Sequence, residues 1–121
     1  MRKDIVTEAI KSCDSFCEDL EKEFKAINEA NDQEREELQE QLMDVLEIAT
    51  GKDFNGTRTY MILLGTGGPA MRITGELDEY DMPASADYQY QDWGTEWTSG
   101  RPNSEQEKLL VDFASLFYFG E

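Results

Sequence analysis

The chain has 121 residues, with 27 Asp and Glu against 11 Lys and Arg and no histidine, so its formal net charge is −16 at pH 7. Such a charge repels DNA, RNA and anionic membranes, whose phosphate groups need cationic contacts. It attracts the basic clefts in which proteins hold nucleic acid. We therefore expect no direct contact with nucleic acid or membrane, and a basic nucleic-acid-binding protein as partner.

The composition predicts one folded domain, residues 1–121. Apolar residues make up 39% of the chain and aromatics 11%, whereas acidic disordered tails lack aromatics. No apolar run approaches the roughly 20 residues of a membrane span. Arg2 and Lys3 precede no apolar stretch of the kind that a signal peptide needs, and Cys13 and Cys17 are expected to be reduced. These features indicate a cytoplasmic protein.

Residues 1–50 have the apolar spacing of a helical hairpin. In the first helix the apolar side chains recur every three or four positions: Ile5, Ala9, Cys13, Phe16, Leu20, Phe24 and Ile27. Asn31 and Asp32 offer a cap, and a second helix is expected from Gln33 to Thr50, where Gly51 ends it. One continuous helix bent near Asn31 would fit the same pattern.

The rest of the chain predicts a small antiparallel sheet of three strands over residues 57–97, followed by a C-terminal helix over 104–119. The strands are expected at 57–64, 70–77 and 86–93, with the Gly-rich sequence 65–69 as a turn. Ser104 and Glu107 have the spacing of a capping box before the last helix. The predicted fold class is α+β, with helices covering one sheet.

Negative charge is expected to form a ridge on the second helix. Four carboxylates fall four, four and three residues apart: Glu36, Glu40, Asp44 and Glu47. Neighbours on such a ridge lie about 5–6 Å apart, which is close to the spacing of successive phosphates along a nucleic-acid strand. A solvated face that merely keeps the protein soluble would have the same pattern.

A second acidic segment lies between Ile73 and Gly100, where there is no Lys or Arg. It combines carboxylates with aromatic side chains, a pairing that suits arginine-rich surfaces through bidentate hydrogen bonds and cation–π stacking. For the tryptophans, packing in the core is the favoured interpretation, whereas the loop 78–81 is expected to be exposed. The candidate partner-binding residues are Glu76, Asp78, Glu79, Tyr80, Asp81, Asp87, Asp92, Trp93, Glu96 and Trp97.

The sequence argues against an enzyme. Without histidine, Ser-His-Asp and Cys-His nucleophile systems are impossible. The turn at residues 65–68 lacks the Lys and Ser or Thr of a phosphate-binding loop. Carboxylates at Asp78, Glu79 and Asp81 could ligate calcium or magnesium, but they lack the pattern of an EF-hand loop. We predict no catalytic residues, no metal site and no cofactor.

The sequence from Tyr60 to Ile73 (YMILLGTGGPAMRI), with 75–78 (GELD) and 91–95 (QDWGT), resembles small proteins carried by phages and other mobile elements. Small acidic proteins from such elements include anti-CRISPR and anti-restriction inhibitors, several of which imitate DNA. The resemblance implies an antagonist of a host-defence protein, such as a CRISPR effector or a restriction enzyme. A phage-encoded protein of this kind would act in the host-cell cytoplasm.

The leading hypothesis is therefore an inhibitor whose carboxylates stand in for nucleic-acid phosphates. The alternative is a structural or adaptor protein that oligomerises, for example as a dimer, through its helical hairpin. In that case Phe16, Leu20, Phe24 and Ile27 would form an interface between copies. A metal-dependent enzyme built on carboxylates is a third, weaker hypothesis.

Overall fold

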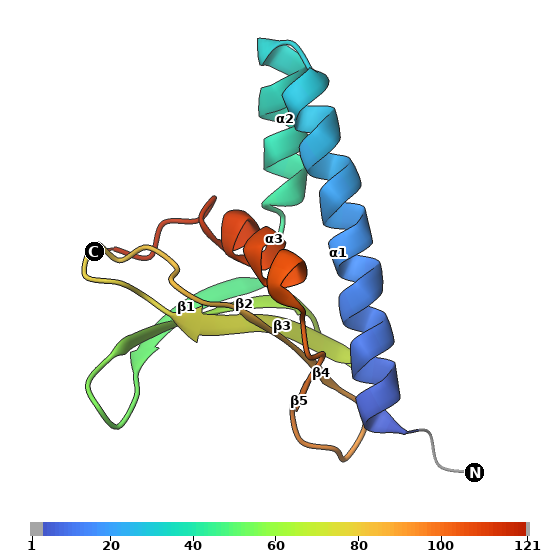
Figure 1. Cartoon of the computed structure of the whole chain (residues 1–121), viewed down its shortest axis with the longest axis vertical. Coiled ribbons are helices and arrows are strands. Elements are labelled where there is room, and N and C mark those ends of the chain that lie inside the picture. The colour runs from blue at the N-terminus through green and yellow to red at the C-terminus, as the bar shows by residue number, and fades with distance from the viewer. Residues whose placement is uncertain (1–3, 121) are drawn as a thin grey trace.

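The computed structural model describes residues 4–120, which fold as two helices, a five-stranded antiparallel sheet and a last helix (Figure 1). Each strand pairs with its neighbour in the sequence, so the order across the sheet is β1-β2-β3-β4-β5. Helices α1 and α3 cover one face of the sheet, and α2 folds back along α1. The elements are α1 (Ile5–Glu29), α2 (Asp32–Leu42), β1 (Glu47–Lys52), β2 (Arg58–Gly65), β3 (Ala70–Glu76), β4 (Asp87–Gln91), β5 (Thr98–Ser99) and α3 (Ser104–Ala114).

The fold is α+β, but the prediction of a three-stranded sheet is wrong. Strands β2, β3 and β4 lie where the sequence predicts strands, and β1 and β5 are additional. The predicted second helix, 33–50, ends at Leu42, and the chain then enters β1. Pairing with β2, which sets Ile48 opposite Ile62 and Thr50 opposite Tyr60, outweighs the helical spacing because Ile and Thr are β-branched.

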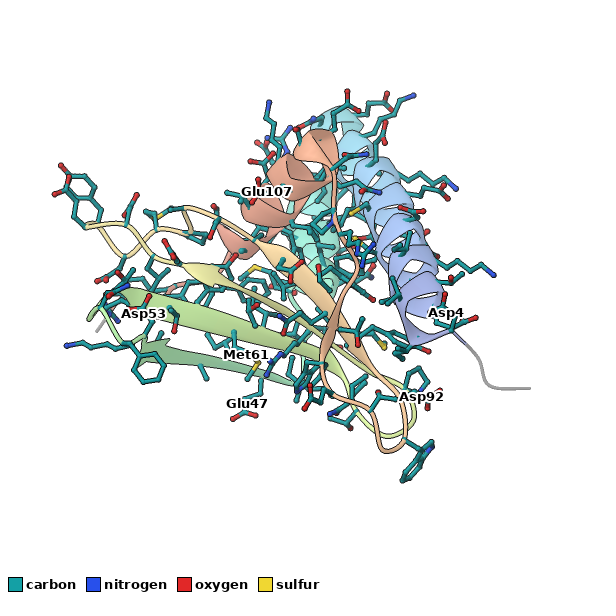
Figure 2. The ribbon with its side chains drawn as sticks, turned by 60° about the horizontal axis from the view of Figure 1, so that its bottom comes forward. Asp4, Glu47, Asp53, Met61, Asp92 and Glu107 are labelled. Atoms are coloured by element: carbon teal, nitrogen blue, oxygen red, sulfur yellow. The ribbon has the colours of Figure 1, made fainter. Side chains whose placement is uncertain are left out.

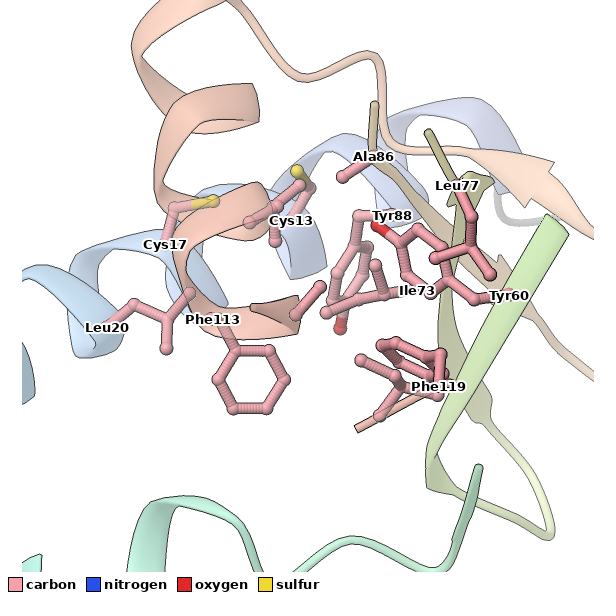
Figure 3. Close-up of a cluster of buried hydrophobic side chains, with 13 residues drawn as sticks. Cys13, Cys17, Leu20, Tyr60, Ile73, Leu77, Ala86, Tyr88, Phe113 and Phe119 are labelled. Atoms are coloured by element: carbon pink, nitrogen blue, oxygen red, sulfur yellow. The ribbon is translucent and has the colours of Figure 1, made fainter. Parts of the chain in front are cut away.

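The core lies between the sheet and the two helices that cover it (Figure 3). Alternate residues of the strands face the helices, so Tyr60, Ile73 and Tyr88 are each at most 2% exposed. They meet the apolar faces of α1 and α3, including Leu20 and Phe113. Burying each such large side chain contributes about 1.5–3 kcal/mol.

The predicted apolar stripe on α1 is confirmed as a core-facing stripe. Leu20 and Ile27 are buried, and Phe16 and Phe24 pack against the core of the same chain. Phe16 also contacts the rings of Tyr88 and Phe113, with ring centroids 5.4 and 5.6 Å away. The four side chains proposed for a hairpin-mediated interface between copies therefore pack against the core of their own chain.

Two glycines allow close approach between layers. At Gly75 in β3, a Cβ atom would overlap the carbonyl oxygen of Ser85, so only glycine lets the β3–β4 connection cross there. At Gly100, a Cβ would lie 2.5 Å from the Cβ of Cys13 on α1. Gly75 therefore allows close contact with the β3–β4 connection, and Gly100 allows close contact with α1.

The caps of the last two helices are asparagines. Asn31 accepts a hydrogen bond from the Glu34 amide at 2.9 Å at the start of α2. At α3 the capping box is formed by Asn103 and Gln106, one residue before the predicted Ser104 and Glu107. No helix within residues 4–120 is both long and apolar enough to cross a membrane.

Candidate interaction surfaces

The helical hairpin is closed by one arginine. Arg35, the only Lys or Arg in α2, donates from Nε to the carbonyl of Ile27 at 3.2 Å and from Nη2 to that of Ala30 at 3.3 Å. These carbonyls belong to the C-terminal end of α1, whose partial negative charge a cation stabilises. The positive charge of Arg35 is thus used at the turn and does not neutralise the rest of α2.

The far end of the hairpin concentrates negative charge. Residues 18–44, which we call the hairpin tip, contain eleven carboxylates and three cations, a net charge of −8. Figure 1 shows the turn between α1 and α2, with the helical ends next to it, extending past α3 and away from the sheet. Asp32 lies 3.9 Å from Arg35, and Glu34 accepts a hydrogen bond from the Asn31 side chain at 3.1 Å.

The other carboxylates of the hairpin tip have no partner within residues 4–120. Glu36, Glu37, Glu40 and Asp44 are exposed, accept no hydrogen bond and form no ion pair there. Burial against the groove between α1 and α2 raises the pKa of Glu23, and the nearby carboxylate of Asp19 adds to the rise. The tip therefore presents carboxylates that are free to bind an external cation.

The predicted ridge on the second helix is only half formed. Glu36 and Glu40 lie one turn apart on α2, as predicted, but α2 ends before Asp44. Glu47 begins β1 and pairs with Leu63, on the sheet face that the helices leave uncovered (Figure 2). Because the chain changes from helix to strand after Leu42, the four carboxylates do not share one face.

The second acidic segment does not form one surface either. Its parts lie in the β3–β4 connection, on β4, and in the β4–β5 connection, and the two connections are at opposite ends of β4. Along the long axis of the molecule, α2 is at one end and the β4–β5 connection is at the other (Figure 1). A single surface combining Glu36 and Glu40 with Glu96 is therefore excluded.

Several carboxylates of this segment have structural roles. Asp78 accepts hydrogen bonds from the amides of Tyr80 and Met82, at 2.8 and 3.0 Å, and shapes the loop between them. Asp81, which has φ of 62°, pairs with Arg58. Arg58 also donates to the Phe119 carbonyl at 3.1 Å, and so ties the loop to the C-terminal segment.

Two more carboxylates are engaged near β5. Asp87 accepts hydrogen bonds from Ser99 Oγ at 2.7 Å and Gln89 Nε2 at 3.3 Å, and Asp92 accepts one from the Trp93 amide at 2.8 Å. By contrast, three glutamates of the segment are exposed and form no side-chain hydrogen bond or ion pair within residues 4–120: Glu76, Glu79 and Glu96.

The aromatic residues of the segment have different environments. Tyr80 is 78% exposed. Trp93 is 82% exposed, so its predicted place in the core is wrong; its indole lies beside Gly68 in the β2–β3 turn. Trp97 is half-buried outside the helix-covered core, and the guanidinium of Arg72 stacks 4.2 Å from its ring centroid.

The uncovered face of the sheet carries a shallow depression of about 650 Å³, lined in part by Met61, Arg72 and Asp87. Arg72 donates from Nε to Gln89 at 2.7 Å, and burial lowers its pKa. Sequence reasoning missed this arginine, although its isolation among apolar and small residues in the predicted strand 70–77 was a usable signal.

Neither a metal centre nor a related protein guides the assignment. Within residues 4–120, no group of three or more Cys, Asp or Glu side chains is placed to hold a metal ion. The chain matches no protein-family model, no curated protein sequence and no solved structure. The charge and geometry of these surfaces are therefore the indications of function.

Proposed function

We propose that the protein is an inhibitor that binds a basic nucleic-acid-binding protein through the hairpin tip and occupies its phosphate-binding cleft. The main observation is that the tip has a net charge of −8, while carboxylates such as Glu36, Glu37 and Glu40 have no partner among residues 4–120. The host-defence role, in which the target is a CRISPR effector or a restriction enzyme, is supported by the resemblance to small mobile-element proteins.

The density of charge on the hairpin tip is close to that of DNA. Glu18 to Glu29 of α1 span about 18 Å at about 1.5 Å per residue, and α2 runs back beside them. A net charge of −8 over that length is one negative charge per about 2 Å, against about 1.7 Å for double-stranded DNA. A cleft that attracts the duplex would attract this hairpin by the same long-range field.

The hairpin tip is also held in place before it binds. Helix α1 is anchored in the core by Cys13 and Leu20, and Arg35 fixes the turn. Carboxylates on anchored helices lose little backbone freedom on binding, and each can accept two hydrogen bonds from an arginine side chain. The second acidic segment lacks this advantage because Asp78, Asp81 and Asp87 are already engaged.

The test is capture from a host lysate followed by competition with DNA. The full chain, immobilised through its C-terminus, should retain a nucleic-acid-binding protein at low salt, and added duplex DNA should release it. The association rate should fall as salt rises from about 0.05 to 0.5 M, because the Debye length shortens from about 14 to about 4 Å. Recovery of no nucleic-acid-binding protein, or a captured one that binds DNA and this chain together, would contradict the proposal.

A further inference from the structure

The outer edge of β1 is open for pairing. Within residues 4–120 no strand pairs with β1 on the side away from β2. The amide of Asp53 donates a hydrogen bond to the carbonyl of Thr57 at 3.0 Å. Asp53 and Thr57 are therefore a hydrogen-bonded pair at the end of the antiparallel ladder between β1 and β2. Since hydrogen-bonded and non-hydrogen-bonded pairs alternate, the amide and carbonyl groups of Ile48 and Thr50 are directed outward. An exposed edge of this kind is a template for another strand.

The surroundings of this edge differ in charge from the rest of the protein. Residues 45–75, which we call the neutral segment, contain two carboxylates and three cations, a net charge of +1. The remaining residues therefore have a net charge of −17, which together with this +1 gives the total of −16. Two copies of this acidic chain repel one another over most of their surfaces, and the neutral segment is where they approach at least cost.

Exposed apolar side chains cluster near the same edge. Leu46 is 60% exposed, Ile48 is 40% exposed and Phe54 is fully exposed, and Met43 lies just before them at 36%. They make up half of the large exposed apolar residues within 4–120, although β1 and its flanks are a small part of the chain. Large apolar groups left in water beside an open strand mark an interaction surface.

We propose that this edge binds a second copy of the chain, with β1 pairing antiparallel to β1 of that copy about a two-fold axis at Ala49. Ile48 of each copy then lies opposite Thr50 of the other, and these residues exchange four backbone hydrogen bonds. Glu47 lies opposite Gly51 of the other copy, so no like charges face each other in the ladder. The result is one continuous sheet of ten strands.

A second copy fits this edge better than a basic partner does. The neutral segment gives a cationic protein no attraction, whereas the hairpin tip offers it a net charge of −8. The dimer and the binding function therefore use different surfaces and respond to salt in opposite directions. Salt weakens a contact between opposite charges, and it strengthens pairing of two chains of charge −16 by screening their repulsion.

Cysteine cross-linking tests the axis. In a non-hydrogen-bonded antiparallel pair the Cα atoms are about 4.5 Å apart, within the range of a disulfide. Ala49→Cys should therefore give a covalent dimer under mild oxidation, while the buried Cys13 and Cys17 do not react. In the matched control Thr50→Cys, the two thiols are offset by two residues along the strands, beyond disulfide reach, and the chain should stay uncross-linked.

Sedimentation of the wild-type chain tests the association itself. We expect a species of twice the 13.9 kDa chain mass, with a dimer Kd that falls at least threefold between about 0.05 and 0.5 M NaCl. Ile48→Glu, at a position already exposed, should give a monomer with an unchanged circular dichroism spectrum. A wild-type chain that stays monomeric at all concentrations and salts, or a dimer in which Ala49→Cys does not cross-link, would overturn the proposal.

Discussion

The hairpin tip and the neutral segment follow each other in the chain and have opposite physical characters. The tip has a net charge of −8, and α2 within it has no fully buried residue. The neutral segment has a net charge of +1 and supplies Tyr60, Ile62 and Ile73 to the core. Within the tip, α2 thus mainly faces solvent, whereas β2 and β3 of the neutral segment form much of the core.

The same difference is seen in what the charged side chains of the two regions contact. In the sheet region several charged side chains are engaged within the fold, as Arg58 is with Asp81 and Arg72 with Trp97. In the hairpin tip, apart from the turn at Arg35, the carboxylates have no partner in the described part of the chain. Mutations of core side chains in the sheet should therefore affect folding, whereas mutations of exposed carboxylates in the hairpin tip should affect binding.

The largest expected contrast is in core truncation. Ile73→Ala removes a fully buried side chain between β3 and the helices and should lower the free energy of unfolding by about 2–5 kcal/mol. Leu38→Ala in α2 removes a half-buried side chain and should cost about 1 kcal/mol. Urea denaturation measures both. Equal losses would show that the hairpin tip contributes to the core as much as the sheet does.

Glycine substitution within the sheet should separate its inner and outer strands. Gly75→Ala places a Cβ against the Ser85 carbonyl and should destabilise the protein by about 1–3 kcal/mol. The control Gly51→Ala in β1 meets only Thr59 Oγ1 at 3.5 Å, and its effect should stay within about 0.5 kcal/mol. Thermal unfolding compares them, and a larger loss at Gly51 would refute the close packing inferred at Gly75.

Removing a helix cap should act locally in the hairpin tip. Asn31→Ala deletes the cap of α2 at a cost of about 1 kcal/mol. Because α2 has no fully buried residue, its amides should exchange faster while those of β2 and β3 are unaffected. Asn103→Ala at α3, which packs on the core, should instead lower global stability. Hydrogen exchange resolves the two outcomes, and uniform acceleration by Asn31→Ala would argue against local opening.

The smallest expected effect is electrostatic. Neutralising Glu36, Glu37 and Glu40 to Gln and Asp44 to Asn relieves like-charge repulsion and should stabilise the protein at low salt by about 0.5–1 kcal/mol in total. High salt should remove the gain. Loss of stability in this variant would indicate that the carboxylates have internal partners, contrary to their unpaired state.

Sequence periodicity was sufficient to predict the long helices and strands, but it was not sufficient to predict the secondary structure at their junctions. The apolar stripe on α1 follows the helical spacing of three or four residues, and Tyr88 and Tyr90 on β4 follow the two-residue alternation of a strand. The segment from Val45 to Thr50 fits both periods, and only its long-range pairing with β2 makes it a strand. Strand β5 has two residues, too few for any periodic signal.

The sequence was sufficient to predict which segments are acidic, but not how their carboxylates are arranged in space. Counting charges located the acidic segments, and Glu36 and Glu40 do share a helix. Whether a carboxylate is free depends on tertiary partners, such as Arg58 for Asp81, which lie 23 residues away in sequence. The same holds for Trp93, whose exposure is set by the path of the β4–β5 connection.

Binding of the partner should depend on where the carboxylates lie and not on the total charge of the chain. Two variants of equal charge test it on the captured partner: one with the four hairpin-tip neutralisations, and one with Glu76→Gln, Glu79→Gln, Glu96→Gln and Asp112→Asn at exposed positions elsewhere. The hairpin-tip variant should lose affinity by about 30-fold or more, from about 0.5–1 kcal/mol per charge, and the control by less than about threefold. Equal losses of affinity in the two variants would show that total charge, and not the position of the carboxylates, governs binding.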